Sequence, residues 1–301
     1  MATNPVFNGL TAYIQEQRLP LIKEAVLKAK SASLFNLQTD IKTSAALNLL
    51  TTDVKFGDGL ACGWDEAGTN TLSQRILETG AIKINMPYCD KEMLKYWTQY
   101  QVKVAAGQKT LPFEEDFVAA VIENVKAAVE TAIWQGDKAS DNVNLNKFDG
   151  LIKILNAAEG VVKATIAGKD VYADVMAVYN AIPVKVLDGA SILVGADKFR
   201  EFVQAMVEKN FYHYDGKPMD NEIMIPGTNV KLIAVNGLNG TGKMVAGQLD
   251  KNFFYGCDLM NDEEKFEFWY SQDNREFRLA IEFNAGVQVA FPNEVVLGAT
   301  A

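Results

Sequence analysis

One long helical stripe constrains the fold of this chain more than any other feature. The apolar positions that recur at helical spacing are Phe117, Val121, Val125, Ala128 and Ala132. Pro112 precedes the stripe and Gly136 ends it, and three acids at 114–116 complement the positive end of the helix dipole. We therefore expect a helix over residues 113–135, which at 1.5 Å per residue is about 35 Å long, the dimension of a whole domain.

The segments around this helix alternate between helical and extended patterns. Residues 7–30 predict a helix interrupted at Pro20, which is either a terminal arm or a core helix. Residues 44–87 are rich in Thr, Gly and Asn, with short apolar runs at 47–54 and 82–86. This composition predicts a long two-stranded excursion that binds something outside its own domain. Asp90 then caps a helix that stops near Gly107.

The second half of the chain predicts a compact α/β unit followed by a β-rich tail. Between residues 160 and 250 we expect a helix after Asp170, a strand at 191–194, a helix at 197–209 and a strand at 230–235. In the tail, apolar residues alternate with other residues from Phe277 to Phe291. The tail is therefore expected to form a hairpin or meander, broken at residues 284–286.

Charge and cysteine content exclude several classes of protein. The chain has 29 Lys and Arg against 38 Asp and Glu, a net charge of −9, which argues against a protein that grips phosphate backbones. Cys62, Cys89 and Cys257 lack Cys-x-x-Cys spacing and indicate neither a disulfide framework nor a zinc site. Since no signal peptide or membrane span is apparent, we expect a cytoplasmic protein.

A glycine-rich run at 237–243 is the strongest candidate for a nucleotide site. From Gly237 to Lys243 it satisfies G-x-x-x-x-G-K, and it follows a predicted strand, so its amides and Lys243 could cradle phosphates. Met244, however, occupies the position where a Ser or Thr would hold magnesium, and residues 244–249 predict a strand, not a helix. These two facts favour a glycine-rich hairpin turn over a nucleotide site.

The other candidate residues have simpler structural interpretations. His213 is the single histidine and could serve as a catalytic base, but no nucleophile is evident beside it. The acidic groups at 114–116, 137–149 and 262–264 fit helix-start, loop and turn roles better than catalysis or metal binding. We expect no catalytic residue, cofactor or metal ion. Trp97, Trp134 and Trp269 are expected in the core, whereas Trp64 in the excursion is a candidate intersubunit contact.

Three local patterns accompany this order of elements. Ala-Ile-Trp-Gln-Gly-Asp at 132–137 closes the long helix, and Phe-Asp-Gly-Leu at 148–151 enters the next element. A strand and hairpin at 229–249 lead into Phe-Phe-Tyr-Gly at 253–256, and residues 277–291 form the closing strands. In this combination the chain resembles the major capsid proteins of tailed bacteriophages, which share the Hong Kong 97-type shell fold.

The resemblance implies an α+β fold with five parts. These are an N-terminal arm at 1–43, an extended β loop at 44–87, a peripheral domain at 88–160 and 241–301, a spine helix at 113–135 within that domain, and an α/β axial domain at 161–240. The extended loop would lie over a neighbouring subunit, and axial domains would meet at the centres of capsomers.

The resemblance also implies a function without an active site. Copies would assemble as hexamers and pentamers into an icosahedral shell that encloses double-stranded phage DNA without sequence-specific binding. The protein would belong to the virion and assemble in the bacterial host cytoplasm, away from membranes, with portal, scaffold or decoration proteins as further partners. Two alternatives stay open: an encapsulin-like compartment shell, disfavoured by the long 44–87 segment, and a P-loop enzyme that uses residues 237–243.

Overall fold

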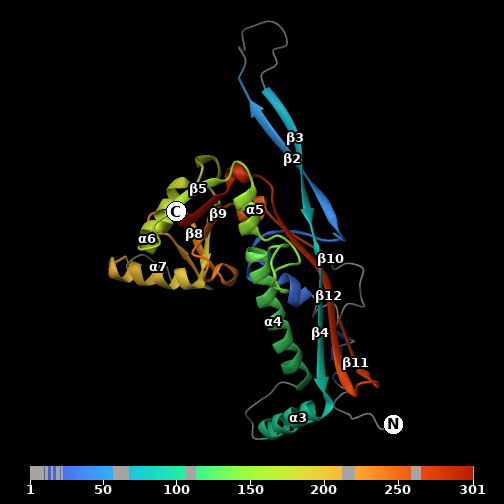
Figure 1. The fold of residues 1–301 in the computed structure, drawn as a ribbon. Coiled ribbons are helices and arrows are strands. Elements are labelled where there is room, and N and C mark those ends of the chain that lie inside the picture. The colour runs from blue at the N-terminus through green and yellow to red at the C-terminus, as the bar shows by residue number, and fades with distance from the viewer. Residues whose placement is uncertain are drawn as a thin grey trace.

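The computed structural model describes residues 10, 13–14, 16–17, 21, 23–56, 68–105, 113–211, 221–258 and 266–300. Figure 1 shows three parts: an α/β unit at one side, an elongated limb of one long helix beside long strands, and a hairpin that projects beyond both. The C-terminal strand β13 (Val296–Thr300) lies in the α/β unit.

The limb is built on a five-stranded sheet and the long helix α4 (Phe113–Gln135). Strands β1 (Asn36–Gln38), β10 (Phe253–Asp258), β12 (Glu276–Val289) and β11 (Phe266–Ser271) follow one another, and β4 (Gly80–Cys89) also pairs with β12. Helices α2 (Lys30–Leu34), α3 (Asp90–Ala105), α5 (Leu151–Ala157) and the short α8 (Leu249–Asn252) complete this part. Fully buried large side chains such as Trp134, Tyr255 and Phe283 form its core.

The predicted helix at 113–135 is confirmed, but one side of its stripe was misplaced. Val121, Val125 and Ala132 are buried, as the periodicity predicts. Ala128 is exposed, and Val129 takes its place in the core. The predicted stripe takes a three-residue step from Val125 to Ala128, whereas the buried face takes a four-residue step to Val129. Since one turn contains 3.6 residues, spacing alone does not decide between the two steps.

The N-terminal helical residues belong to the limb core in this subunit. Leu10, Ile14, Leu21, Ala25 and Val26 are all buried in the same cluster as the α4 side chains. The sequence left open whether this segment is an arm or a core helix, and its described apolar residues pack as core.

The α/β unit contains a six-stranded sheet with its own core. The strand order is β5 (Val162–Ile166), β13 (Val296–Thr300), β9 (Met244–Gly247), β6 (Ser191–Gly195), β8 (Lys231–Val235) and β7 (Glu222–Met224). Helices α6 (Val171–Ala181) and α7 (Ala196–Glu208) pack against it, and the Asp170 carboxylate caps α6 by accepting the N–H groups of Tyr172 and Ala173. The predicted helices and strands of this unit are confirmed, and the sheet also takes in strands that follow residue 240.

The tail strand is longer than the sequence predicts. Residues 284–286 do not break it, because β12 runs without interruption from Glu276 to Val289. The Cβ of any other residue at Gly286 would lie 2.1 Å from the carbonyl oxygen of Glu78. The glycine therefore marks a close approach of two chain segments, not a turn.

The predicted excursion at 44–87 is shorter than expected. Its two strands are β2 (Ser44–Val54) and β3 (Gly68–Glu78), which pair antiparallel with Ser44 opposite Glu78. The apolar run at 82–86 instead lies in β4 and pairs with β12 along the limb. Local composition could not distinguish these two destinations, because pairing with a strand two hundred residues away decides between them.

The tryptophans expected in the core have three different environments. Trp134 is fully buried and Trp97 is partly buried against the limb core, as predicted. Trp269 is 41% exposed on β11, so the prediction of a core position is wrong. Successive side chains of a strand point to opposite faces. Phe268 is buried, so Trp269, the next residue, points to the other face, which is exposed to solvent.

Candidate functional site

The glycine-rich run at 237–243 connects two strands, but it is not the hairpin turn that the sequence favoured, because β6 lies between β8 and β9 in the sheet. It connects β8 to β9, and Met244 begins a strand where a nucleotide-binding loop would begin a helix. The Asn239 side chain accepts the N–H of Ala196 at the start of α7 (2.6 Å), and Asp197 accepts the N–H of Gly240 (3.1 Å). The glycine-rich run and the start of α7 therefore form hydrogen bonds with each other. The structure gives no support to the P-loop alternative.

The remaining chemical candidates do not converge on a site. Trp64, His213, Cys62 and the acids at 262–264 lie outside the described residues. Asp137 and Asp149 both bind Lys153, and no group of three possible metal ligands is found among the residues that the structure describes. Cys89 and Cys257 are free, and burial raises the pKa of the Cys257 thiol to about 12. In the described part of the chain, no helix is long and apolar enough to cross a membrane.

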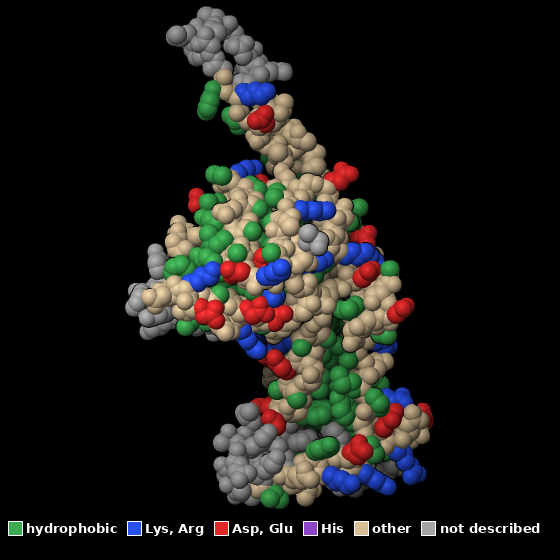
Figure 2. Space-filling model, turned by 60° about the vertical axis from the view of Figure 1, so that its left-hand side comes forward, with side chains coloured by type: hydrophobic (Ala, Val, Ile, Leu, Met, Phe, Trp, Pro, Cys, Tyr) green, Lys and Arg blue, Asp and Glu red, His purple; other side chains and the backbone are tan. Residues whose placement is uncertain are grey.

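The β2–β3 hairpin has two chemically different faces. Residues opposite each other in an antiparallel pair share a face, so Leu50 and Leu72 lie on one side together. Val54 and Ile76 belong to the same side by alternation. These four side chains, which we call the apolar face, are 58–79% exposed. Figure 2 shows hydrophobic side chains on the hairpin where it projects from the body.

The other face is covered only at its base. Leu47, Leu49 and Leu77 are buried there in a small cluster with Ile41 and Ala290 of the limb. Farther out, the directly opposed pair Thr51 and Thr71 is polar and exposed. The hairpin therefore uses one face to attach to its own subunit and leaves large apolar side chains exposed on the other, where the polar pairs Asn48–Gln74 and Thr52–Asn70 alternate with them. Exposed apolar side chains of this size are typical of a surface that contacts another molecule.

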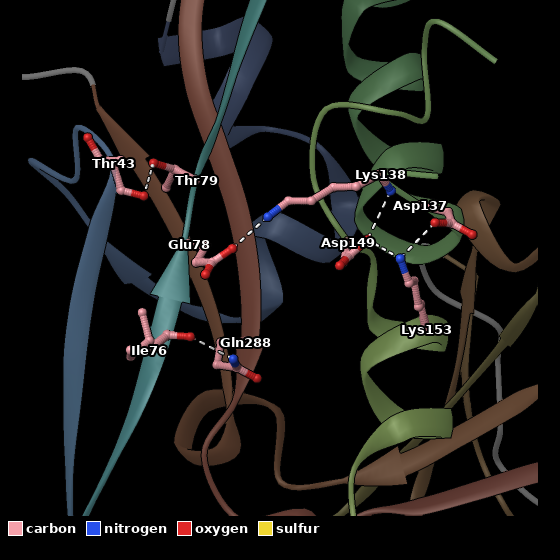
Figure 3. A network of polar contacts seen from close by, with 9 residues as sticks. All are labelled: Thr43, Ile76, Glu78, Thr79, Asp137, Lys138, Asp149, Lys153 and Gln288. Atoms are coloured by element: carbon pink, nitrogen blue, oxygen red, sulfur yellow. Dashed lines mark hydrogen bonds and ion pairs between the residues drawn. The ribbon is translucent and has the colours of Figure 1, made fainter. Parts of the chain in front are cut away.

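Polar contacts hold the base of the hairpin to the limb. The Lys138 ammonium lies 2.5 Å from the Glu78 carboxylate, and the Gln288 amide donates to the Ile76 carbonyl oxygen (2.7 Å). The N–H of Thr79 donates to the Thr43 carbonyl oxygen (2.9 Å), which closes the hairpin across its two strands. Figure 3 shows these contacts side by side at the point where β3 leaves the body.

The same contacts continue into a chain of ion pairs beyond Lys138. The Asp149 carboxylate accepts the Lys138 N–H (2.9 Å), and the Lys153 ammonium lies 2.7 Å from both Asp149 and Asp137 (Figure 3). Hydrogen bonds from Lys153 and from the Ala139 N–H lower the pKa of Asp137. For Asp149, partial burial acts to raise the pKa, but hydrogen bonds from Lys138 and Lys153 outweigh it and lower the pKa. We call the residues Glu78, Asp137, Lys138, Asp149 and Lys153 the hairpin-base network.

A buried carboxylate joins the N-terminal segment, the spine helix and the α/β unit. Glu130 of α4 is 4% exposed and accepts both the N–H (2.9 Å) and the hydroxyl (2.5 Å) of Ser31. The Trp134 indole N–H donates to the same hydroxyl oxygen (2.7 Å), and the Gln135 amide donates to the carbonyl oxygen of Gly237 (2.7 Å). Gly237 lies so close to α4 that a Cβ there would be 2.3 Å from the Glu130 carbonyl oxygen.

Burial dominates the electrostatics of this junction. It raises the pKa of the Glu130 carboxyl, although hydrogen bonds from Ser31 and from the Gly237 N–H act in the opposite direction. We call Ser31, Glu130, Trp134 and Gly237 the Glu130 junction. The sequence analysis missed it, and the signal that could have identified it is a lone acid between Val129 and the apolar residues 132–134.

Comparison with known proteins identifies the fold. No protein-family model matches the chain, and no curated protein matches it. Among solved structures, a chain of the satellite phage P4 procapsid, solved with its size determination (Sid) protein, aligns with a TM-score of 0.63 and 14% identity, covering 100% of this chain and 98% of that one. The capsid of an empty GTA particle aligns at 0.53 with 10% identity, covering 91% and 96%. A virus-like particle from Pyrococcus furiosus aligns at 0.50 with 9% identity, covering 94% and 98%.

These matches cover nearly the whole of each chain, so the similarity concerns the complete arrangement of limb, hairpin and α/β unit. The protein has a capsid-protein fold, and the α+β fold expected from the sequence resemblance is confirmed. Of the three structures, the phage procapsid has the largest TM-score.

Proposed function

We propose that this protein is the major capsid protein of a tailed bacteriophage. Copies assemble as hexamers and pentamers into an icosahedral shell that encloses double-stranded DNA. The observation that carries the proposal is the apolar face of the hairpin, because four large apolar side chains on a projecting two-stranded element have no stable place in water. The capsid-protein fold supports the same function.

In this proposal the hairpin is the extended loop that lies on a neighbouring subunit, and Trp64, which lies between β2 and β3 in the sequence, is an intersubunit contact. The limb with its spine helix serves as the peripheral domain, and the α/β unit serves as the axial domain at capsomer centres. A contact between different surfaces of identical copies repeats around a ring, which is how a single chain can build capsomers.

The charge of the chain is compatible with a DNA container. A net charge of −9 disfavours tight, sequence-independent binding to phosphates, so packaged DNA is enclosed and not gripped. Portal, scaffold or decoration proteins would be further partners, with assembly in the bacterial cytoplasm and residence in the virion.

An encapsulin-like compartment is the second candidate, since the virus-like particle shares the fold. The length of the projecting hairpin and the larger TM-score of the phage procapsid favour the phage shell. Residues 237–243 connect strand β8 to strand β9, so they give no support to a nucleotide-dependent enzyme.

Electron microscopy of the expressed protein tests the proposal. Closed shells, or hexameric and pentameric rings, are expected at high protein concentration. A discrete monomer or dimer under the same conditions would contradict it. Nucleic acid inside purified particles supports the phage shell, whereas a co-purifying protein cargo without nucleic acid favours the compartment.

A further inference from the structure

A groove runs along the limb between the N-terminal helical residues and the first half of α4. It has a volume of about 300 Å³. Leu21, Val118 and Ile122 are buried side chains that form its apolar floor. Ala119 at its edge is small and exposed, so another helix could approach α4 closely there.

The rim of this groove is acidic. Three carboxylates, those of Glu24, Glu115 and Glu123, line it against one ammonium, that of Lys126. Lys126 lies 3.1 Å from Glu24 and 3.6 Å from Glu123, and Lys28 lies 3.5 Å from Glu24. Two ammonium groups therefore offset part of the negative charge of the three carboxylates. Burial and then the charges of Glu115 and Glu24 raise the pKa of Tyr13, which is consistent with a negative potential inside the groove.

Helix α3 carries the complementary surface. Lys91, Lys95 and Val102 share one side of the helix by their spacing, whereas Tyr96 lies about 120° around the helix from that side. All four are exposed, Tyr96 and Val102 to 67% and 66%. Glu92 is the one exposed acid among the described α3 side chains. The opposite side of α3 contacts β4, and Trp97 packs on the limb core.

We infer that α3 of one copy of this chain seats in the groove between the N-terminal helical residues and α4 of a second copy. Val102 covers the apolar floor, and Lys91 and Lys95 pair with Glu115 and Glu123. The two surfaces differ, so the contact is heterologous and can propagate from copy to copy. Figure 1 shows α3 across the foot of the limb, separate from the hairpin at its far end, so this contact adds a second region of adhesion. The inference rests on the proposed self-assembly.

Charge reversal with rescue tests the contact. Lys91→Glu with Lys95→Glu, and separately Glu115→Lys with Glu123→Lys, should each raise the protein concentration needed for shell formation at least tenfold, measured by light scattering and electron microscopy. The quadruple variant should return it to within about threefold of the wild type, because opposite charges again face each other. Thermal unfolding of the unassembled subunits shows that each variant is folded.

A matched control separates contact from net charge. Lys91→Glu and Lys95→Glu combined with Glu159→Lys and Glu208→Lys give the same net charge as the quadruple variant. The two new lysines lie at exposed positions, one in the turn that follows α5 and one at the end of α7. This control should stay impaired. If wild-type shells form and the first pair of reversals assembles normally, or if the control is rescued equally well, the contact is overturned while the proposed function stands. If the wild type forms no assembly, the proposed function itself fails.

Discussion

The Glu130 junction and the hairpin-base network are both clusters of charged and polar groups, yet burial makes them opposite in character. Glu130 is buried, and its carboxylate accepts hydrogen bonds from the N–H and O–H groups of Ser31. In the hairpin-base network, oppositely charged side chains pair in partial contact with water. Burial raises the pKa of Glu130, whereas hydrogen bonds to Lys153 lower that of Asp137.

The difference shows how one subunit can be rigid in one place and adjustable in another. A buried hydrogen-bonded carboxylate has no water to replace a lost partner, so the elements that it joins stay in one arrangement. Exposed ion pairs exchange readily with water and salt and contribute little each. We therefore expect the Glu130 junction to hold the limb and the α/β unit firmly, and the ion pairs at the hairpin base to allow more adjustment.

The largest effect on stability is expected at the Glu130 junction. Glu130→Ala leaves the Ser31 N–H and hydroxyl without their acceptor and should lower the free energy of unfolding by about 3 kcal/mol. Denaturant unfolding of dilute, unassembled subunits measures this. Glu123→Ala, at an exposed glutamate on the same helix, is the control and should change it by less than about 0.5 kcal/mol. Equal effects of the two substitutions would show that burial does not set the contribution of Glu130 apart from that of an exposed glutamate.

A pH series sharpens the contrast. A glutamate whose pKa is raised in the folded state adds stability as the pH falls through that raised value toward the ordinary value of 4.5, because the folded chain then binds the proton more tightly. The wild type should therefore gain melting temperature relative to Glu130→Gln across this window. The lowered pKa of Asp137 acts with the opposite sign, since its contribution is lost on acidification, but it is common to both proteins and cancels. Parallel pH profiles would show that burial does not perturb Glu130.

The smallest effect is expected at the hairpin base. Lys138→Met removes the ion pair with Glu78, whose side chains are 44% and 60% exposed, and should cost about 0–1 kcal/mol. Amide exchange at the ends of β2 and β3 should speed up by at most about fivefold, and the difference should shrink at high salt. Lys163→Met on β5 controls for loss of one exposed lysine. Complete release of the hairpin would mean that the exposed hairpin-base network contributes more to the stability of the subunit than the buried Glu130 junction does.

Sequence periodicity predicted the elements whose neighbours are local. The helices α4, α6 and α7 and the strands β6 and β8 follow directly from apolar spacing and from Asp170 as a cap. The path of residues 82–86 and the continuity of β12 depend on pairing between β4 and β12, which no local pattern reveals. The resemblance to capsid proteins supplied the overall arrangement that periodicity could not.

The functional surfaces were less accessible to sequence analysis. The long excursion was recognised, but its single candidate contact, Trp64, lies outside the described residues and stays a prediction. The apolar face became visible only when the register placed Leu50 opposite Leu72. Glu130 was missed because a single acid in an apolar stripe does not reveal its partner, Ser31, which lies 99 residues away.

The central claim is that the apolar face of the hairpin joins copies of this chain, and one pair of variants tests it most directly. Leu50→Lys with Leu72→Glu places an opposite-charge pair on the apolar face, and Thr51→Lys with Thr71→Glu places the same pair on the polar face one residue away. Particles of both variants are counted by electron microscopy at a concentration at which the wild type assembles. The account predicts that the threonine variant forms shells and the leucine variant stays as folded, unassembled subunits. Normal shells from the leucine variant would contradict it.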